Sequence, residues 1–407
     1  MESKNLSPQH LKIISDVIDQ VMDEYAKNNK IIFASEAERA KNHFGSIHRE
    51  LKNWKKSKQC MVPKCTKQSI KKSHTIPKGM SLGQISENGH LLTPKFDQQI
   101  GEMVVNSVGV SLASTFPGFC SEHEQLFKEF ETQNNIETEA HVYLQTYRAA
   151  CREFFRTKFL LEQNNWLLSH YSKLRDSNLM EIIKKRAIDN GFPDAAKFIS
   201  FSMENDPLIE FMNGKLKGVQ RLSTHIQNRL LPGLEKAVFE GNKDDIFIKA
   251  ISIDILIPVA LSSCAAFYIN DYGEERPVTL IMNVVPSNGR SLIISCGDVL
   301  DADFIEYYIN SWCINVFQLL SMVESWMVNG TDQWYIKPSV WEVIGDIRKK
   351  TILNDIFECK QNIGQEYVFS IFDEIRKEML ATLKEKEEPT DDAQYWQFVK
   401  EQRAKIT

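Results

Sequence analysis

The amino-acid sequence predicts an α+β protein that is predominantly α-helical, with an irregular module between two helical parts. Three observations predict this class. Apolar residues recur at helical spacing through most of the chain, residues 57–120 lose that spacing while Gly, Pro, Ser and Thr increase, and β-branched residues gather mainly between 246 and 297. The predicted parts are an N-terminal helical segment (1–56), the irregular module (57–135) and a mainly helical domain (136–407).

The composition is that of an ordinary globular protein. The 407 residues are 43% hydrophobic and 25% charged, and 49 Lys and Arg against 54 Asp and Glu give a net charge of −5. A chain of this length buries enough surface to fold without disulfides or metal ions. The acidic balance argues against a polycation that coats nucleic acid along its whole length.

The sequence shows no signal peptide and no membrane-spanning helix. The longest uncharged apolar run, 255–269, contains Pro258 and has 15 residues, whereas a spanning helix needs about 18 or more. We therefore expect a cytoplasmic protein without membrane contact, in which most of the eight cysteines are reduced. Five of them stand singly among apolar residues and are interpreted as buried small hydrophobes: Cys151, Cys264, Cys296, Cys313 and Cys359.

The N-terminal segment is interpreted as a pair of helices. Ser7 and Pro8 fit the N-cap and first turn of the first helix. Ser35, with Glu38 three residues later, fits a capping box that starts the second helix, which runs towards Trp54.

Helical periodicity returns after the irregular module and is interrupted once. Residues 138–242 are expected to be helical, and a β-hairpin is expected around 276–297, because Ser287-Asn288-Gly289 separates two β-branched runs. The apolar run 255–269 fits a further strand of the same small antiparallel sheet. Apolar residues between 312 and 327 predict a buried core helix, with a partner or ligand groove as the alternative. The later helices are expected at 303–327, 339–352, 364–388 and 394–403.

Two pairs of metal-ligating residues lie in the irregular module. Cys60 and Cys65 form a C-x4-C pair around a turn that contains proline, and Cys120 and His123 form a C-x2-H pair. Zinc prefers four sulfur or imidazole ligands in a tetrahedron, and these pairs together supply three cysteines and one histidine. The sequence therefore predicts a structural Zn²⁺ site.

The second pair is expected at the start of a helix, where Ser121 and Glu124 fit a capping box. A turn plus a helix start is the ligand arrangement of a treble-clef zinc site. The alternative is that three reduced cysteines and a histidine in a helix cap never meet.

Residues 51–86 form a basic patch on an otherwise acidic chain, with nine lysines and no Asp or Glu. Lysines near a nucleic-acid backbone gain binding energy through counterion release. We therefore predict DNA or RNA binding through this patch, with a solvated lysine-rich face as the alternative. The predicted contact residues are Lys55, Lys56, Lys58, Lys64, Lys67, Lys71, Lys72 and Lys78.

One motif of the module carries possible chemistry. Ser73-His74-Thr75-Ile76-Pro77 begins eight residues after Cys65 and lies between the two ligand pairs. Over residues 57–131 this arrangement resembles the HNH family of treble-clef nucleases. The resemblance implies that His74 is the general base that activates water against a phosphodiester, beside a Mg²⁺ or Mn²⁺ ion. The alternatives are a structural histidine and a metal ligand.

Some positions depart from the family pattern. The metal-ligating residue expected before the base is Ser73, and a histidine expected later in the helix is Phe127. Asn88 and Asn106 are candidates for the central asparagine, and Asn88 with His90 is a possible second metal or polar site. A zinc-binding fold that has lost catalysis fits the same residues.

Two functions follow as hypotheses. The first is an HNH-like metal-dependent nuclease, or its degenerate descendant, that acts on or binds DNA or RNA. The second is a non-catalytic, zinc-scaffolded protein-binding or sensor protein, in which residues 136–407 bind a protein partner or self-associate. No Walker loop, Rossmann fingerprint or nucleophile elbow is present, which disfavours the corresponding enzymes. The chain also resembles bacterial proteins, and zinc-nuclease modules in phage defence imply a possible antiviral role.

Overall fold

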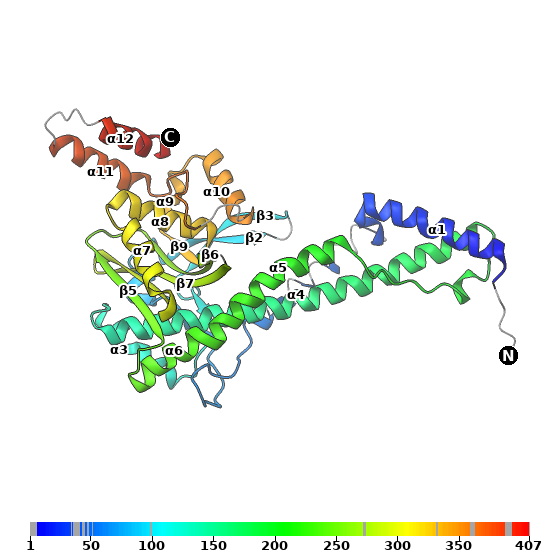
Figure 1. Ribbon diagram of the computed structural model, residues 1–407, viewed down its shortest axis with the longest axis horizontal. Helices are drawn as coiled ribbons and strands as arrows, with labels where there is room; N and C mark the ends of the chain where they lie inside the picture. Colours follow the sequence, from blue (N-terminus) through cyan, green and yellow to red (C-terminus); the bar gives the residue numbers. More distant parts are fainter. Residues whose placement is uncertain are drawn as a thin grey trace. The chain divides into compact units, whose positions relative to one another are not determined.

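The computed structural model places the helices and strands in the order drawn in Figure 1. It describes residues 6–406 except 34, 36–40, 43–44, 47–48, 51, 98–99, 272–273, 331–332, 359–362 and 387–392. The chain divides into two compact units, which we call unit 1 (1–53 and 158–221) and unit 2 (54–157 and 222–407). The predicted three-part division remains a prediction.

Unit 1 is helical and joins two segments that are far apart in the sequence. Ser7 accepts a hydrogen bond from the backbone N–H of His10 (3.1 Å) and Pro8 opens the first helix, which confirms the predicted helix start. Its elements are α1 (Pro8–Lys27), η1 (Asn29–Ile32), η4 (Ala195–Lys197) and parts of α4 (Glu139–Asp189) and α5 (Pro207–His225). Its core includes Val17, Val21, Tyr25, Leu179, Ile183 and Phe192.

The structure describes only part of the predicted second helix. Every described position from 41 to 54 is helical, whereas Ser35 has no regular structure. Glu38, the partner in the predicted capping box, lies outside the described residues. None of the helices in the described part of the chain is long and apolar enough to cross a membrane.

Unit 2 is built on an antiparallel sheet of seven strands in the order β3-β2-β9-β6-β7-β8-β5. The predicted hairpin is confirmed, because β7 and β8 pair as far as Ser287 and Arg290, and Asn288 and Gly289 have the positive φ angles of a tight turn. The apolar run forms β6, as predicted. The strands are β2 (His90–Asp97), β3 (Glu102–Gly109), β5 (Ile246–Ile253), β6 (Val259–Asp271), β7 (Glu274–Ser287), β8 (Arg290–Asp298) and β9 (Trp334–Ile336).

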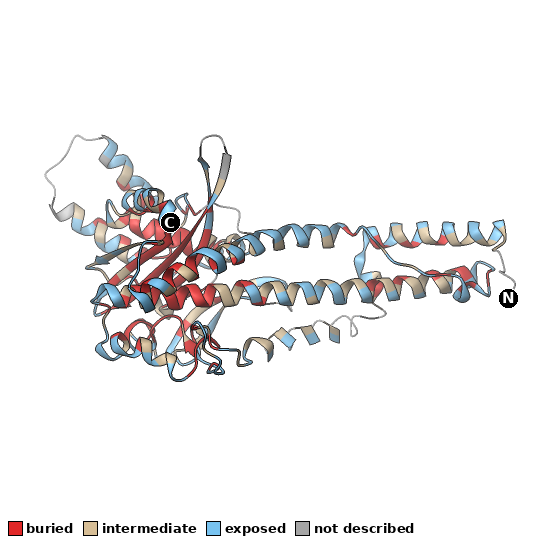
Figure 2. Cartoon of the chain, turned by 60° about the horizontal axis from the view of Figure 1, so that its bottom comes forward, coloured by how far each residue is buried: buried red, intermediate tan, exposed pale blue. Residues whose placement is uncertain are grey.

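Both faces of the central strands are covered. Leu280, Met282 and Val284 of β7 pack into the cluster that includes α7 (Ala302–Trp312) and α8 (Val316–Asn329), while Ile281 and Val285 pack into the cluster that includes the first half of α4. Figure 2 shows buried residues concentrated in the sheet and the adjoining helices of unit 2. The metal centre described below shares the second cluster.

The remaining elements of unit 2 are short. Two strands, β1 (Ser73–His74) and β4 (Thr115–Phe116), form a separate antiparallel pair. The helices are η2 (Lys78–Leu82), η3 (His123–Phe127), α3 (Lys128–Gln133), η5 (Ile226–Leu230), α6 (Leu231–Glu235), η6 (Lys236–Glu240), η7 (Val299–Asp301), α7 (Ala302–Trp312), α8 (Val316–Asn329), α9 (Pro338–Glu342), α10 (Asp346–Glu358), α11 (Asp373–Lys386) and α12 (Ala393–Ile406).

Several predicted helices are divided or shortened. The predicted helix 303–327 is two helices, because Asn315 caps α8 by accepting the backbone N–H of Gln318 (3.0 Å). The predicted helix 339–352 is likewise split into α9 and α10. The predicted helix 364–388 begins only at Asp373, and α12 confirms the last helix.

Candidate metal centre and the neighbouring histidine

The two predicted ligand pairs meet in one cluster. One donor atom each from Cys60, Cys65, Cys120 and His123 lies within 4.8 Å of all the others. The His123 Nδ1 atom lies 3.3 Å from the Cys60 sulfur and 3.4 Å from the Cys120 sulfur. The four residues are therefore close enough to bind a metal ion.

The first pair lies in a tight turn. The N–H of Cys60 donates to the Lys67 carbonyl (2.9 Å), and the N–H of Cys65 donates to the Val62 carbonyl (3.1 Å). Lys64 adopts a left-handed conformation with φ of 62°. This backbone geometry turns both thiols to the same side, as the Pro-containing spacing predicted.

The second pair is held against the first by backbone hydrogen bonds. The N–H of Met61 donates to the Gly118 carbonyl (3.0 Å), and the N–H of Cys120 donates to the Cys60 sulfur (3.4 Å). A Cβ atom at Gly118 would collide with the Phe116 ring. Glycine is therefore required where the chain approaches the first pair.

The helix start at the second pair differs from the prediction. The helical turn is η3, its N-cap is Glu122, and no side-chain hydrogen bond caps it. The predicted capping box of Ser121 and Glu124 is therefore wrong. Instead the N–H of Glu124 donates to the Cys120 carbonyl (2.9 Å), which starts the turn through the backbone alone.

The thiols of the cluster differ in acidity. Burial raises the pKa of Cys60 to about 11. Burial also acts to raise the pKa of Cys120, but hydrogen bonds from the backbone N–H groups of His123 and Glu122 and from the side chains of Cys60 and Cys65 together hold this pKa below its ordinary value. A metal ion bound here would keep the coordinating thiols deprotonated whatever their pKa in its absence.

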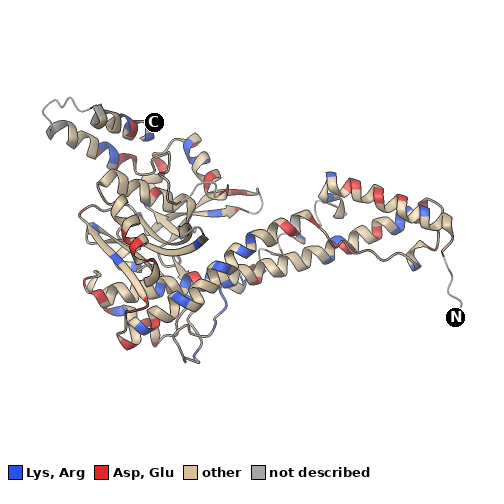
Figure 3. Cartoon of the chain, viewed as in Figure 1, with Lys and Arg blue, Asp and Glu red and all other residues tan. Residues whose placement is uncertain are grey.

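The predicted lysines lie in the same stretch of chain as the first ligand pair and His74, and most of them are exposed. Lys58 is half-buried, and Lys67 forms an ion pair with Glu122. Figure 3 shows the cationic residues of this loop-rich segment. The exposed predicted lysines are Lys55, Lys56, Lys64, Lys67, Lys71, Lys72 and Lys78.

His74 lies on β1, whose pairing with β4 sets its register opposite Thr115. Its Nδ1 atom is 3.0 Å from the carbonyl of Ala113. Burial, with the nearby charge of Arg148, lowers the pKa of His74 to about 4. The imidazole is therefore neutral at pH 7, with Nδ1 as the N–H donor and Nε2 unprotonated.

Two buried polar side chains that the sequence did not indicate lie near His74. Arg148 is fully buried, donates to Glu131 Oε1 (2.7 Å) and Gln145 Oε1 (3.2 Å), and covers the Phe127 ring at 4.5 Å. Gln145 donates to the carbonyl of Thr75 (3.0 Å). In the sequence these two residues are marked by their spacing of three on one helix. Polar residues on exposed helix faces have the same spacing, so it does not indicate burial.

The positions that depart from the HNH pattern are structural. Ser73 is fully buried and its Oγ accepts the backbone N–H of Phe119 (3.1 Å). Phe127 is fully buried in the aromatic cluster with Phe119 and Phe130. Neither side chain is a metal ligand in this arrangement.

The predicted second polar site lies on a turn and a strand. Asn88 is at a left-handed position (φ 51°), and its carbonyl is 2.9 Å from Nδ1 of the exposed His90. Asn106 is exposed on β3, opposite Thr93. Within the described part of the chain, the cluster of possible ligands contains none of these three residues.

Three of the singly placed cysteines confirm the prediction of buried thiols, and a fourth is only half-buried. Cys151, Cys264 and Cys296 are buried free thiols, and Cys313 is half-buried. Burial raises the pKa of each of these thiols. Cys359 lies outside the described residues.

Comparisons with models of protein families, with curated proteins and with solved structures find no match to this chain. The class of protein is therefore defined by the fold and the site alone. It is a mixed α+β protein with a seven-stranded antiparallel sheet and a candidate Cys3His metal centre.

Proposed function

We propose that residues 57–131 form a zinc-stabilised nucleic-acid-binding module of the HNH type. The module combines the Cys3His cluster, the β1–β4 strand pair and the exposed lysines in one short stretch of unit 2. Nucleic-acid binding is its first candidate function. Phosphodiester hydrolysis is the second.

Zinc is the metal that fits this donor set. Three sulfurs and one imidazole nitrogen are typical of structural zinc. Zn–S bonds of about 2.3 Å and Zn–N bonds of about 2.0 Å place neighbouring sulfur and nitrogen ligands about 3.5 Å apart in a tetrahedron. The distances of 3.3 and 3.4 Å from His123 to two of the sulfurs are close to this value.

The observation that carries nucleic-acid binding is the exposure of the lysines in the chain segment that carries the first ligand pair and His74. Seven of the eight predicted lysines are exposed, and residues 51–86 contain no Asp or Glu to neutralise them. Glu122, from the second ligand pair, pairs with Lys67. The other exposed lysines leave a local excess of positive charge that fits phosphates without base-specific contacts.

Binding of the full-length protein to labelled duplex DNA, single-stranded DNA and RNA at several salt concentrations tests this function. Replacing Lys71 and Lys72 by Ala should weaken binding and lower the slope of log K against log salt by about 1 to 2. The matched control replaces Lys215 and Lys217, exposed lysines of α5, and should leave binding unchanged. Absence of binding to all three nucleic acids contradicts the proposal and favours the protein-binding hypothesis.

Hydrolysis is the second candidate because of the orientation of His74. The Ala113 carbonyl holds Nδ1 as the donor, which leaves Nε2 able to accept a proton from water. The lowered pKa keeps this nitrogen unprotonated at pH 7. It also makes His74 a weaker base than an ordinary histidine.

The divalent ion that the HNH resemblance implies does not fit its expected ligand positions. The Ser73 hydroxyl already accepts the backbone N–H of Phe119, and Phe127 is an apolar core residue. We therefore derive no catalytic step through such an ion. This disagreement places binding ahead of cleavage.

A cleavage assay separates the two candidates. Plasmid DNA, single-stranded DNA and RNA are incubated with wild-type protein or His74→Ala, with Mg²⁺ or Mn²⁺ added. Cleavage that the variant loses at unchanged zinc content supports hydrolysis with His74 as the base. Binding without cleavage by either protein supports a degenerate nuclease that only binds.

A further inference from the structure

A second candidate site lies in unit 2, away from the metal centre in sequence and built from different elements. A cavity of about 490 Å³ is bordered by α7, the start of α8 and residues 364–366. Five aromatic side chains line it: Phe267, Phe304, Tyr307, Tyr308 and Trp312. Its volume is within the range of small-molecule sites, about 300 to 1,000 Å³.

The inner aromatic wall is rigid. The ring of Tyr308 lies 5.1 Å from Phe267 and 6.3 Å from Trp312, measured between centroids. The Tyr308 hydroxyl accepts a hydrogen bond from Trp326 Nε1 (2.9 Å) and donates to the Ile363 carbonyl (3.2 Å). These contacts hold the ring in one orientation, so the wall is preformed for a flat ligand.

The rim of the cavity carries an aromatic side chain that is left largely exposed in the folded protein. Tyr307 is 74% exposed although it lines the cavity. An exposed tyrosine beside a rigid aromatic wall can close over a planar ligand and stack on its free face. Binding would remove the apolar surface of that ring from water, which contributes favourably to the binding free energy.

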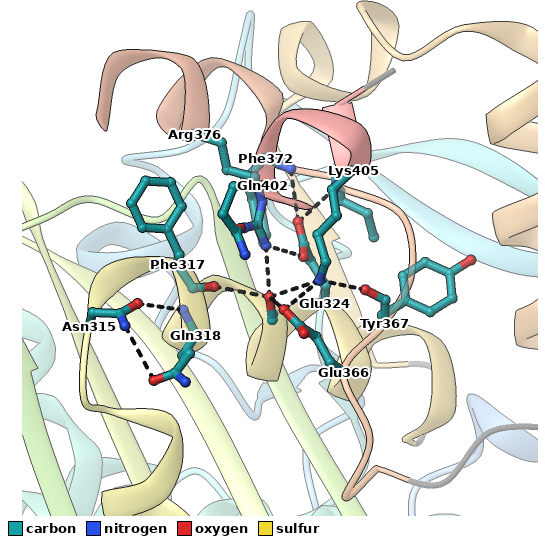
Figure 4. A network of polar contacts seen from close by, with 12 residues as sticks. Asn315, Phe317, Gln318, Glu324, Glu366, Tyr367, Phe372, Arg376, Gln402 and Lys405 are labelled. Atoms are coloured by element: carbon teal, nitrogen blue, oxygen red, sulfur yellow. Dashed lines mark hydrogen bonds and ion pairs between the residues drawn. The ribbon is translucent and has the colours of Figure 1, made fainter. Parts of the chain in front are cut away.

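Two polar side chains of the cavity, Glu366 and Gln318, are among the polar contacts drawn in Figure 4. Glu366 Oε1 accepts hydrogen bonds from Lys405 Nζ (2.6 Å) and Ser321 Oγ (2.7 Å), while Oε2 has no hydrogen-bond partner among the described residues and can accept one from a ligand. Gln318 Oε1 receives Asn315 Nδ2 (3.3 Å), so its amide NH₂ is a donor. The cavity thus offers one acceptor and one donor next to aromatic surface.

The charges around the cavity argue against a cationic ligand. Lys405 neutralises Glu366, and in the same network Arg376 neutralises Glu324 (2.6 Å). A quaternary ammonium ion would need an uncompensated negative charge or a closed aromatic cage. A neutral ring with both donor and acceptor groups on one edge fits the residues better.

We propose that this cavity binds a purine base, as a nucleoside or nucleotide. Purines and pyrimidines alike present a hydrogen-bond donor beside an acceptor, which match Glu366 Oε2 and the Gln318 amide, but the two fused rings of a purine offer the larger face to the aromatic lining. The ring lies against Tyr308 and Trp312, and Tyr307 stacks on it from the rim. This site is independent of nucleic-acid binding at the metal centre.

Calorimetric titration of the full-length protein with guanosine, adenosine, uridine and choline tests the proposal. At least one purine nucleoside should bind more tightly than uridine and choline. Tyr307→Ala should weaken that binding about tenfold, and Gln318→Leu should weaken it as well. The matched control is Tyr268→Ala, because Tyr268 is 58% exposed and does not line the cavity.

Several results would overturn the proposal. Absence of purine binding up to the solubility limit, tighter binding of choline or uridine, or unchanged affinity of Tyr307→Ala would each do so. The exposed position of Tyr307 makes the variant a test of binding and not of folding. A thermal melt of each variant verifies that the fold is retained.

Discussion

The Ser73 hydroxyl accepts the backbone N–H of Phe119 at 3.1 Å, and both residues are fully buried. Ser73 directly precedes His74, and Phe119 directly precedes Cys120. This single hydrogen bond therefore joins the strand that carries the histidine to the chain segment that carries the second ligand pair. This structural role explains the serine at this position. The HNH pattern would place a metal-ligating aspartate or histidine here instead.

Ser73→Ala should destabilise unit 2 by about 1–3 kcal/mol, because it leaves the buried N–H of Phe119 without an acceptor. The measurement is urea denaturation followed by tryptophan fluorescence. Ser86→Ala is the control, since Ser86 donates to the Gly83 carbonyl at an exposed turn, and it should cost less than about 0.5 kcal/mol. Equal stability of Ser73→Ala and wild type would refute the structural role.

Purified protein should contain about one zinc ion per chain, and Cys120→Ala should lose it. The metal content is measured by mass spectrometry, and the melting temperature of the variant should fall because zinc binding contributes to folding. Cys313→Ala is the control, because Cys313 is a half-buried thiol outside the cluster. A well-folded wild type without zinc would exclude the centre.

The metal ligands could be predicted because their signal is local. C-x4-C around a turn and C-x2-H at a helix start each place two donors on one side of the backbone. The two pairs are separated by 54 residues, and the prediction that they meet followed from the assumption that they share one metal ion. The β6 strand and the β7–β8 hairpin were predictable for a similar reason, since β-branched composition and an Asn-Gly turn act over short distances.

The surroundings of His74 could not be predicted. Arg148 and Gln145 lie on a helix where polar residues are ordinarily interpreted as a solvated face, and their burial depends on the tertiary contacts of α4. The β2–β3 hairpin was missed because its strands are partly exposed on both faces and lack a clear alternation of apolar and polar residues. The association of 1–53 with 158–221 is likewise a long-range contact without a local motif.

His74 should titrate near pH 4, well below an ordinary histidine. The pKa is lowered in the folded state, so the unfolded chain binds the proton first as the pH falls. Stability is therefore unaffected by this group above about pH 6.5 and decreases between about pH 6.5 and 4, by up to about 3 kcal/mol. NMR of labelled histidine measures the midpoint directly, with His74→Gln to assign the signal. A His74 midpoint near 6.5 would contradict the burial.

The last prediction concerns the buried ion pair of Arg376 with Glu324, whose side chains are both 0% exposed. Glu324 Oε1 also accepts the backbone N–H groups of Ile371 and Phe372 (2.7 and 3.3 Å), immediately before α11. Arg376→Met leaves this carboxylate buried and uncompensated, so it should cost about 3–5 kcal/mol.

Adding Glu324→Gln to Arg376→Met should restore part of the loss, because the glutamine oxygen still accepts the two N–H groups without a charge. The matched control is Lys377→Met on the next residue of α11, where the pair with Glu374 is 54% and 65% exposed and should contribute about 0–1 kcal/mol. Thermal and urea denaturation of the four proteins measure these differences. A double variant no more stable than Arg376→Met alone would show that the carboxylate's charge is not what destabilises the single variant.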